Sequence, residues 1–289
     1  MTWGTVTNGT LSTADLFDLL AIEEADRAGC ARLLDDTADT ADPQAVAEVR
    51  RAILDRLGSF SEAPFATTST SPMVWLTAYL QVAPTVLHWH RARGIPREVT
   101  RETFADVGRN LAIHRRAHGE FGLETWDWLT AHFTGMLFAL GRLNFMLHPT
   151  KQFVEGVMEP GDWVPGIHIP ESGPLTPQAV DDSLLLARAF FSTCFPDKPV
   201  STAVCVSWLL DPYLLRNLPE KTNIASFVRR FVPMGSPVDD ATAGMFFVFR
   251  TRDRASLAAL PRDTRLQALV LDRAARGEAW QIGTGYLRL

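Results

Sequence analysis

The stretch Gly166-Ile167-His168-Ile169-Pro170-Glu171-Ser172-Gly173-Pro174-Leu175-Thr176-Pro177 decides the fold of the second half of the chain. Its first four residues are typical of a short strand, and Thr176-Pro177 places a capping side chain before a proline at the first position of a helix. The loop between them presents backbone N–H groups and the positive end of a helix dipole at the carboxyl end of the strand. This arrangement suits a phosphate group, although any strand-to-helix connection also needs turn residues and a cap.

Strand and helix patterns continue to alternate after this stretch. Val180, Leu184, Ala187 and Phe191 form the apolar stripe of the helix that Thr176 begins. Residues 203–210 are apolar on both faces, which predicts a central strand. We then expect a helical region from Asp211-Pro212 to about residue 231, a strand near 245–249, a helix over 266–276 and a final strand over 281–289.

The first half of the chain carries helical periodicity instead. Asp42-Pro43 begins one amphipathic helix, and further helices are expected over 72–89, over 100–118 and from Glu124 through Leu137. From Leu143 onward apolar residues alternate, which predicts a strand. The predicted fold class is therefore α+β with an α/β-like C-terminal half: a helical domain over 1–123, then a domain over 124–289 whose mixed sheet lies wholly after Gly141.

Composition and charge exclude several classes of protein. The 289 residues are 46% hydrophobic, which is enough for a buried core, and the net charge of −5 is spread without a basic face for nucleic acid. The start of the chain lacks the pattern of a secretory signal, and no uninterrupted apolar run is long enough to span a membrane. Three widely spaced cysteines indicate a reducing compartment. We therefore predict a soluble, cytoplasmic protein with no nucleic-acid or membrane partner; its oligomeric state stays open.

Two side chains near the loop are candidates for acid–base chemistry. His168 alternates with Ile167 and Ile169, so it faces the side opposite the two isoleucines, and the usual pKa of histidine suits a general base near neutral pH. A hydrogen-bonded structural histidine is the alternative. Glu171 would serve as a base only if burial raised its pKa, and an exposed loop carboxylate is the alternative there.

Metal catalysis is not expected from the histidine spacing. His88 and His90 fall on different sides of a helix, and His114 with His118 lacks the glutamate of the His-Glu-x-x-His motif. Neither a Gly-x-Ser-x-Gly elbow nor a phosphate-binding Gly-Lys-Ser loop occurs in the sequence. We predict no metal.

Three strings, in this order and at this spacing, resemble a known family. The family comprises bacterial proteins that combine an N-acyltransferase N-terminal helical domain with a GNAT-like C-terminal domain. The strings are Leu140-Gly141-Arg142-Leu143-Asn144-Phe145, then His168-Ile169-Pro170 with Gly173-Pro174-Leu175, and then Ser207-Trp208-Leu209-Leu210-Asp211-Pro212 followed by Thr222-Asn223-Ile224.

The resemblance implies where acyl-CoA binds. Residues 166–169 take the place of the central GNAT strand that splays from its neighbour, residues 203–210, and acyl-CoA lies in the opening. The pantetheine arm pairs with the backbone at Ile167 and Ile169, and the pyrophosphate meets Gly173, Leu175 and Thr176. The loop departs from the usual GNAT sequence, since it has one glycine, no arginine and a proline at 174 that removes a backbone donor.

The resemblance also implies a reaction. A small amine attacks the thioester of acyl-CoA directly, His168 or Glu171 removes its proton, Ser207 faces the opening and Asn223 lies near the thiol end. The alternative is a non-catalytic GNAT-like module that binds a small molecule or a protein through the same cleft. Convergence of His168, Ser207 and Asn223 on one pocket would favour catalysis over binding alone.

Overall fold

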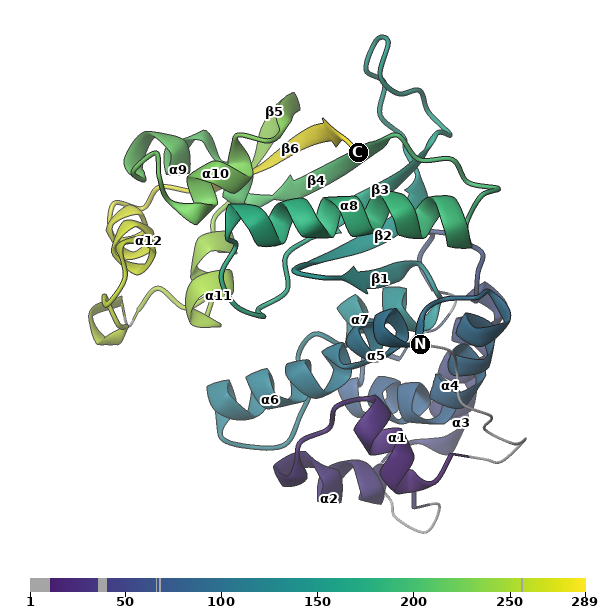
Figure 1. The fold of residues 1–289 in the computed structure, drawn as a ribbon. Helices are drawn as coiled ribbons and strands as arrows, with labels where there is room; N and C mark the ends of the chain where they lie inside the picture. The colour runs from purple at the N-terminus through teal and green to yellow at the C-terminus, as the bar shows by residue number, and fades with distance from the viewer. Residues whose placement is uncertain (1–10, 36–40, 66, 68, 256) are drawn as a thin grey trace. The chain divides into compact units, whose positions relative to one another are not determined.

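The structure, a computed structural model, describes residues 11–35, 41–65, 67, 69–255 and 257–289, which form two compact units. The first unit, called here the helical unit, holds the chain up to Leu140 together with Asn144–Pro149 and Thr193–Asp197. The second, called the sheet unit, holds Gly141–Leu143, Thr150–Ser192 and Lys198–Leu289. Helices together with a mixed six-stranded sheet confirm the predicted α+β class (Figure 1). The domain boundary after Leu123 stays a prediction.

The predicted helices of the helical unit begin within about three residues of the expected positions, and two helices that were not predicted precede them. Asp42 caps one of them, because its side chain accepts a hydrogen bond of 3.0 Å from the Gln44 N–H. The helix predicted over 100–118 is in fact two helices, divided at Ala105, and Gly119 at a φ of 77° ends the second. The seven helices in the described part of this unit are α1 (Thr13–Leu19), α2 (Glu24–Leu33), α3 (Pro43–Arg56), α4 (Pro72–Ala92), α5 (Arg97–Phe104), α6 (Asp106–His118) and α7 (Trp126–Phe133).

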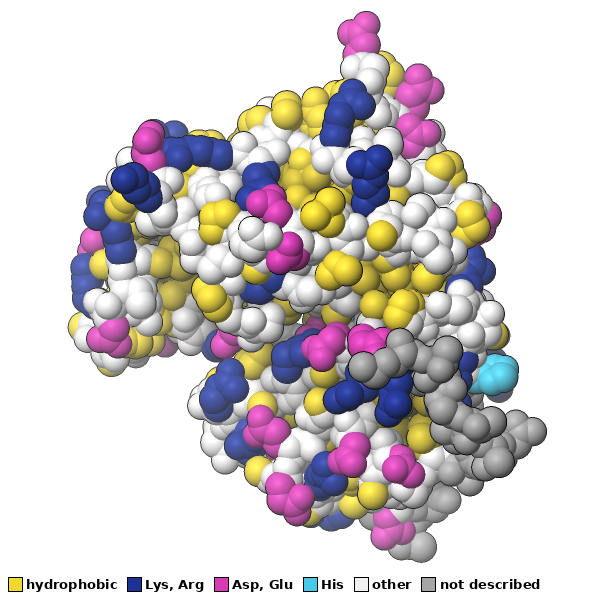
Figure 2. All heavy atoms as spheres, in the orientation of Figure 1, with side chains coloured by type: hydrophobic (Ala, Val, Ile, Leu, Met, Phe, Trp, Pro, Cys, Tyr) yellow, Lys and Arg dark blue, Asp and Glu magenta, His cyan; other side chains and the backbone are white. Residues whose placement is uncertain are grey.

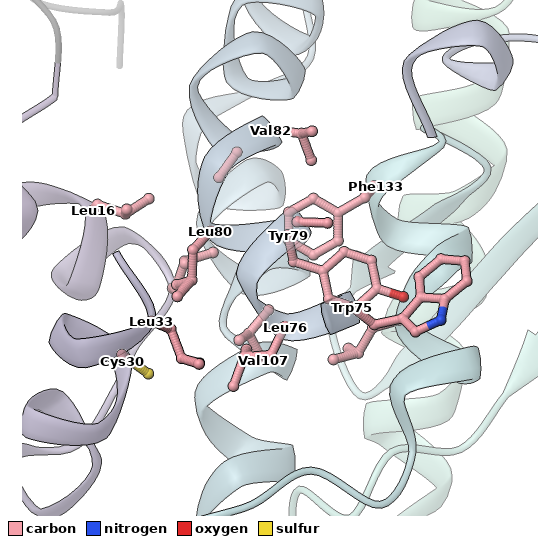
Figure 3. Close-up of a cluster of buried hydrophobic side chains, with 14 of the residues drawn as sticks. Leu16, Cys30, Leu33, Trp75, Leu76, Tyr79, Leu80, Val82, Val107 and Phe133 are labelled. Carbon is pink, nitrogen blue, oxygen red and sulfur yellow. The ribbon is translucent and has the colours of Figure 1, made fainter. Parts of the chain in front are cut away.

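The core of the helical unit is built around α4. The Tyr79 ring stacks on Phe133 with centroids 4.5 Å apart, and Trp75 stacks on Trp126 at 4.8 Å. Figure 3 shows Tyr79 and Phe133 beside one another within the cluster of buried side chains. The Tyr79 hydroxyl donates a hydrogen bond of 2.6 Å to the Trp126 carbonyl, which satisfies the one polar atom of a fully buried ring.

On the face in view, Lys and Arg side chains lie among Asp and Glu side chains (Figure 2), the interspersed pattern that the sequence predicts.

The sheet begins earlier than predicted. Strand β1 (Leu137–Leu140) precedes Gly141, and β2 (Leu143–Pro149) follows it. The helix expected to run through Leu137 ends at Phe133, where Gly135 adopts a φ of 71°. All four residues of β1 are buried, so this strand carries no alternation that would separate it from a helix.

The sheet unit contains the four strands around the proposed site. They are β3 (Trp163–His168), β4 (Thr202–Ser207), β5 (Val232–Asp240) and β6 (Trp280–Arg288). The strand order is β1-β2-β3-β4-β6-β5, with β4 parallel to β3 and antiparallel to β6. The sequence predicts a central strand over 203–210, and the central position of β4 confirms it. Helix α8 (Pro177–Cys194) runs across one face of this sheet (Figure 1), with Val180, Ala187 and Phe191 buried as predicted.

One prediction for the last third of the chain was wrong, and one strand was missed. Residues 245–249 lie in a helix, α11 (Ala243–Phe249), and the strand is β5, which precedes it. An apolar run of five residues has no period that separates strand from helix. Strand β5 contains Pro233 and Pro237, which an edge strand tolerates and which hide a strand pattern in a sequence.

The helical region predicted over 211–231 is divided into short segments. Strand β4 ends at Ser207, and a 3-10 turn, η1 (Trp208–Leu210), leads to α9 (Pro212–Asn217) and α10 (Asn223–Val228). A further 3-10 turn, η2 (Leu257–Ala259), and α12 (Arg265–Ala275) precede β6. In the part of the chain that the structure describes, no helix is long and apolar enough to cross a membrane.

Candidate active site

The parallel pairing between β3 and β4 is short. Along β4, every residue from Thr202 to Ser207 is aligned with a residue of β6. The register of β4 with β3, by contrast, consists of a single aligned pair, Gly166 with Val204. Ile167 and His168 lie beyond that pair, toward the carboxyl ends of both strands. A ligand that paired with β3 on the side of β4 would bind at this position, because buried N–H and C=O groups need partners.

The register also fixes which side chains share a face of the sheet. Residues aligned across a ladder point to the same face, and successive residues of a strand point to opposite faces. His168, two residues after Gly166, therefore lies on the face of Val204 and Val206, whereas Ser207 lies on the other face. The structure does not bring His168 and Ser207 together on one face.

The two predicted bases differ in their surroundings. His168 is the last residue of β3 and is half-buried. Glu171 is exposed on the loop that follows, and its carboxylate forms an ion pair with Arg250 at the end of α11. The prediction of Glu171 as a base required burial, so His168 is the stronger candidate.

Ser207 and Asn223 occupy the starts of short helical turns. The Ser207 hydroxyl accepts a hydrogen bond of 3.1 Å from the Leu209 N–H and so caps η1. Asn223 is the first residue of α10, whose cap is Thr222, and it is half-buried. Within the described chain the Asn223 amide makes no hydrogen bond, so it remains available to a ligand.

The residues predicted to hold acyl-CoA follow one another along β3, the loop and the start of α8. Ile167 is buried and Ile169 half-buried just past the strand. Gly173 adopts a φ of 100°, and a Cβ added there would meet no atom within 4 Å. Leu175 is buried, and the Thr176 side chain accepts a hydrogen bond of 3.3 Å from the Ala179 N–H, so the predicted helix cap is present.

Arg142 is a site residue to which sequence reasoning gave no role. It follows Gly141 in the turn between β1 and β2, and its guanidinium donates to three carbonyl oxygens of the loop. Nη1 donates to Pro170 at 3.0 Å, Nε and Nη2 to Gly173 at 3.0 and 2.7 Å, and Nε also to Pro174 at 3.2 Å. Burial lowers the pKa of the Arg142 guanidinium, which nevertheless stays charged in any protein.

Two more arginines border the same loop. Arg230, just after α10, donates to the Pro177 carbonyl at 3.2 Å and forms an ion pair with Asp181, whose pKa is lowered by that hydrogen bond. Arg250 pairs with Glu171. A loop that contains no arginine of its own is thus bordered by three, each from a distant part of the sequence. Only Arg142 stood in a string quoted for the family resemblance, and no local signal connected it with the loop.

A pocket of about 300 Å³ lies at the opposite, amino ends of β3 and β4. Its lining is mainly apolar and comes from Val157, Met158, Gly161, Asp162, Trp163, Val164, Pro199, Val200, Ser201 and Thr202. None of the predicted site residues lines it. Among the residues that the structure describes, no group of three or more His, Cys, Asp or Glu side chains is arranged to hold a metal ion.

Two family models match the sequence. The model of a GNAT-like C-terminal domain matches residues 137–287, and the model of an N-acyltransferase N-terminal domain matches residues 12–135. A comparison with curated protein sequences finds no match.

Solved structures of acyltransferases are similar over nearly the whole chain. An acyltransferase in complex with CoA and 10C-teicoplanin is 30% identical, with a TM-score of 0.81. An acyltransferase mutant in complex with octanoyl-CoA is 31% identical, with a TM-score of 0.82. An acyltransferase in complex with decanoyl-CoA and teicoplanin is 31% identical, with a TM-score of 0.80. Each comparison covers 96% of this chain and 87% of the other.

Proposed function

Because the chain belongs to the family that joins an N-acyltransferase N-terminal domain to a GNAT-like C-terminal domain, we propose that it transfers an acyl group from acyl-CoA to the amine of a small molecule. Acyl-CoA is the co-substrate, as in the similar acyltransferases crystallised with CoA, octanoyl-CoA and decanoyl-CoA. The observation that carries the proposal is the short pairing of β3 with β4, next to a loop that leads into the capped helix α8.

Acyl-CoA fits the backbone of this region. The pantetheine arm pairs with β3 beyond Gly166, at Ile167 and Ile169, where the register with β4 leaves room for a ligand. The pyrophosphate lies against Gly173, Leu175 and Thr176, near the amino end of α8, where unpaired N–H groups and the helix dipole attract negative charge. The empty space around Gly173 leaves this side of the loop open.

The similar structures suggest the kind of acyl group and acceptor. One of those acyltransferases was crystallised with octanoyl-CoA, one with decanoyl-CoA and teicoplanin, and one with CoA and 10C-teicoplanin. We therefore propose an acyl chain of octanoyl to decanoyl size and a small-molecule acceptor with a free amine.

His168 is the proposed base. The amine nitrogen attacks the thioester carbonyl, the C–N bond forms, and His168 takes the proton directly or through a water. The C–S bond then breaks, and the CoA thiolate takes up a proton. Asn223, with its unpaired amide, is the proposed donor to the carbonyl oxygen. Ser207 is retained only as the cap of η1, because it lies on the other face.

The test is an assay of CoA release with octanoyl-CoA or decanoyl-CoA and a panel of amines that includes teicoplanin-type acceptors. Loss of a general base lowers a rate by about 10²- to 10⁴-fold, so His168→Ala is expected to reduce kcat by that order. The acyl-CoA affinity, set by backbone and loop, should change little. His88→Ala, on the exposed side of α4, is the matched control. A His168→Ala enzyme with the parental kcat would make His168 a structural residue.

A non-catalytic module that binds the same ligand is the second candidate. The observation in its favour is the separation of His168 and Ser207 on opposite faces of the sheet. Ligand binding alone stabilises a folded protein, by about 2.7 kcal/mol at a hundred times the dissociation constant. A thermal shift with octanoyl-CoA, combined with no acyl transfer to any amine of the panel, would favour this candidate over the enzyme.

A further inference from the structure

We propose that Arg142 is the positioning residue of the loop over 170–176 and supplies the charge that the loop sequence lacks. The inference rests on the proposed function, since it concerns how this loop receives the phosphates of CoA. Arg142 does not itself need to touch the ligand. It acts through the three carbonyl groups that its guanidinium binds, those of Pro170, Gly173 and Pro174.

The contacts of Arg142 fix the direction of two peptide groups in the loop. In a trans peptide the C=O of one residue and the N–H of the next point in opposite directions, and every described peptide here is trans. With the carbonyls of Pro170 and Pro174 directed at Arg142, the N–H groups of Glu171 and Leu175 point away from it. The Leu175 N–H has no hydrogen-bond partner within the described chain. The guanidinium therefore directs these two N–H groups away from itself, and we infer that a phosphate of CoA meets them there.

Arg142 also carries the unbalanced positive charge beside the loop. In the described chain Arg142 has no carboxylate partner, whereas Arg230 and Arg250 are each paired with one. The five charged groups around the loop, Arg142, Arg230 with Asp181, and Arg250 with Glu171, therefore leave one net positive charge. That charge belongs to Arg142. A net positive charge beside those two N–H groups of the loop and a helix amino end favours a phosphate ligand.

The contacts of Arg142 require an arginine and not a lysine. A guanidinium has five N–H donors in a fixed planar fork, so one side chain binds three carbonyls at once. Lysine carries the same charge on a flexible stem without that fork. If Arg142 works by holding the loop, lysine will not replace it; if only charge matters, lysine will.

The experiment measures KM and kcat for two donors, octanoyl-CoA and S-octanoyl-pantetheine, which lacks the nucleotide and its phosphates. Arg142→Gln is expected to raise the KM for octanoyl-CoA at least about tenfold and to change kcat less than about threefold. Its KM for octanoyl-pantetheine should stay within about twofold of the parent. Arg142→Lys keeps the charge but loses the fork, so its KM for octanoyl-CoA should rise less than in Arg142→Gln and stay clearly above the parental value; it also covers the case in which Arg142→Gln fails to fold.

Arg265→Gln is the matched control, because Nε and Nη2 of Arg265 also donate to a backbone carbonyl, that of Asn217, at 3.3 and 3.0 Å. Parental KM values in both Arg142 variants would overturn the inference, as would equal increases of KM for both donors or full rescue by lysine. If the parental protein neither binds free CoA nor turns over octanoyl-CoA, the proposed function fails instead. The two failures are therefore distinguishable.

Discussion

Two charged clusters, one around Asp106 in the helical unit and one around the loop over 170–176 in the sheet unit, use charged side chains in different ways. In the helical unit the Asp106 carboxylate is buried and accepts hydrogen bonds of 2.8 Å from His132, 2.8 Å from Arg109 and 3.2 Å from Asn144. In the sheet unit, the arginines around the loop are partly exposed, and they bind backbone carbonyls or half-exposed carboxylates. The Asp106 carboxylate links side chains of several elements, whereas Arg142 binds three carbonyl groups of one loop.

The exposure of large apolar side chains also differs between the two units. The large hydrophobic side chains that are strongly exposed in the described chain all belong to the sheet unit: Phe153, Leu185, Leu186, Val206, Val232, Val238 and Phe247. The register places Val206, Val232 and Val238 on the face of the sheet that also carries His168. They are 60%, 51% and 67% exposed. Within the described residues, the unit that exposes large apolar side chains is therefore also the unit that carries the proposed site.

The largest expected effect comes from removing the buried Asp106 carboxylate. Asp106→Ala removes the partner of the buried His132 and of the half-buried Arg109, so we expect the free energy of unfolding to fall by about 3–5 kcal/mol. The counterpart in the sheet unit is Asp181→Ala, which removes an exposed partner of Arg230 and should cost less than about 1 kcal/mol. Urea unfolding of the two variants measures both. Equal losses would mean that the two units do not differ in this respect.

The sequence predicts those elements whose signals are local. Helices α3 and α8 each have a capping side chain, a proline at the first position and an apolar stripe, so both were predicted correctly. Strand β1 was missed because its residues are all buried, and α11 because five apolar residues have no readable period. In each case the deciding factor was packing by residues distant in sequence.

For the site, the sequence indicates the loop but not what holds it. Thr176 and Gly173 are recognisable from their neighbours, since a cap and a turn residue act locally. Arg142 lies 31 residues from Gly173 in the sequence, and Arg250 lies 79 residues from Glu171. The turn between β1 and β2 and the end of α11 bring these arginines to the loop, and no spacing rule encodes that approach.

A second prediction concerns pH and the helical unit. His90 is fully buried, its Nδ1 lies 3.0 Å from the Thr100 hydroxyl, and burial lowers its pKa from 6.5 to about 3. The unfolded chain binds the proton more readily, so the stability that His90 contributes is present above pH 6.5 and is lost as the pH falls toward 3. At 1.36 kcal/mol for each pH unit, the loss between pH 6.5 and pH 4 is about 3 kcal/mol.

The measurement is the free energy of unfolding at several pH values between 7 and about 4. In His90→Gln the acid-side decrease should become shallower, even if the variant is less stable at pH 7. His88→Gln, exposed on the same helix, should keep the parental slope. An unchanged slope in His90→Gln would show that other groups cause the loss of stability in acid.

The smallest expected effect concerns Glu171, and it bears on which side chain is the base. The half-exposed ion pair with Arg250 contributes about 0–1 kcal/mol to folding, so Glu171→Gln should leave stability nearly unchanged. The same change removes a negative charge from the loop proposed to receive the phosphates and leaves Arg250 without its carboxylate. We expect the Kd for free CoA to fall by about two- to threefold, an effect that added salt should weaken.

The rate separates the two candidate bases. If His168 is the base, Glu171→Gln keeps kcat within about twofold of the parent, because the exposed carboxylate takes no proton from the acceptor. If Glu171 is the base, kcat falls by about 10²- to 10⁴-fold while His168→Ala remains active. Arg250→Gln completes the comparison: it removes the positive partner and should raise the Kd for CoA, opposite in sign to Glu171→Gln. Opposite shifts in Kd from the two halves of one ion pair, with kcat unchanged in both, would place the pair beside the phosphates and away from the reacting amine.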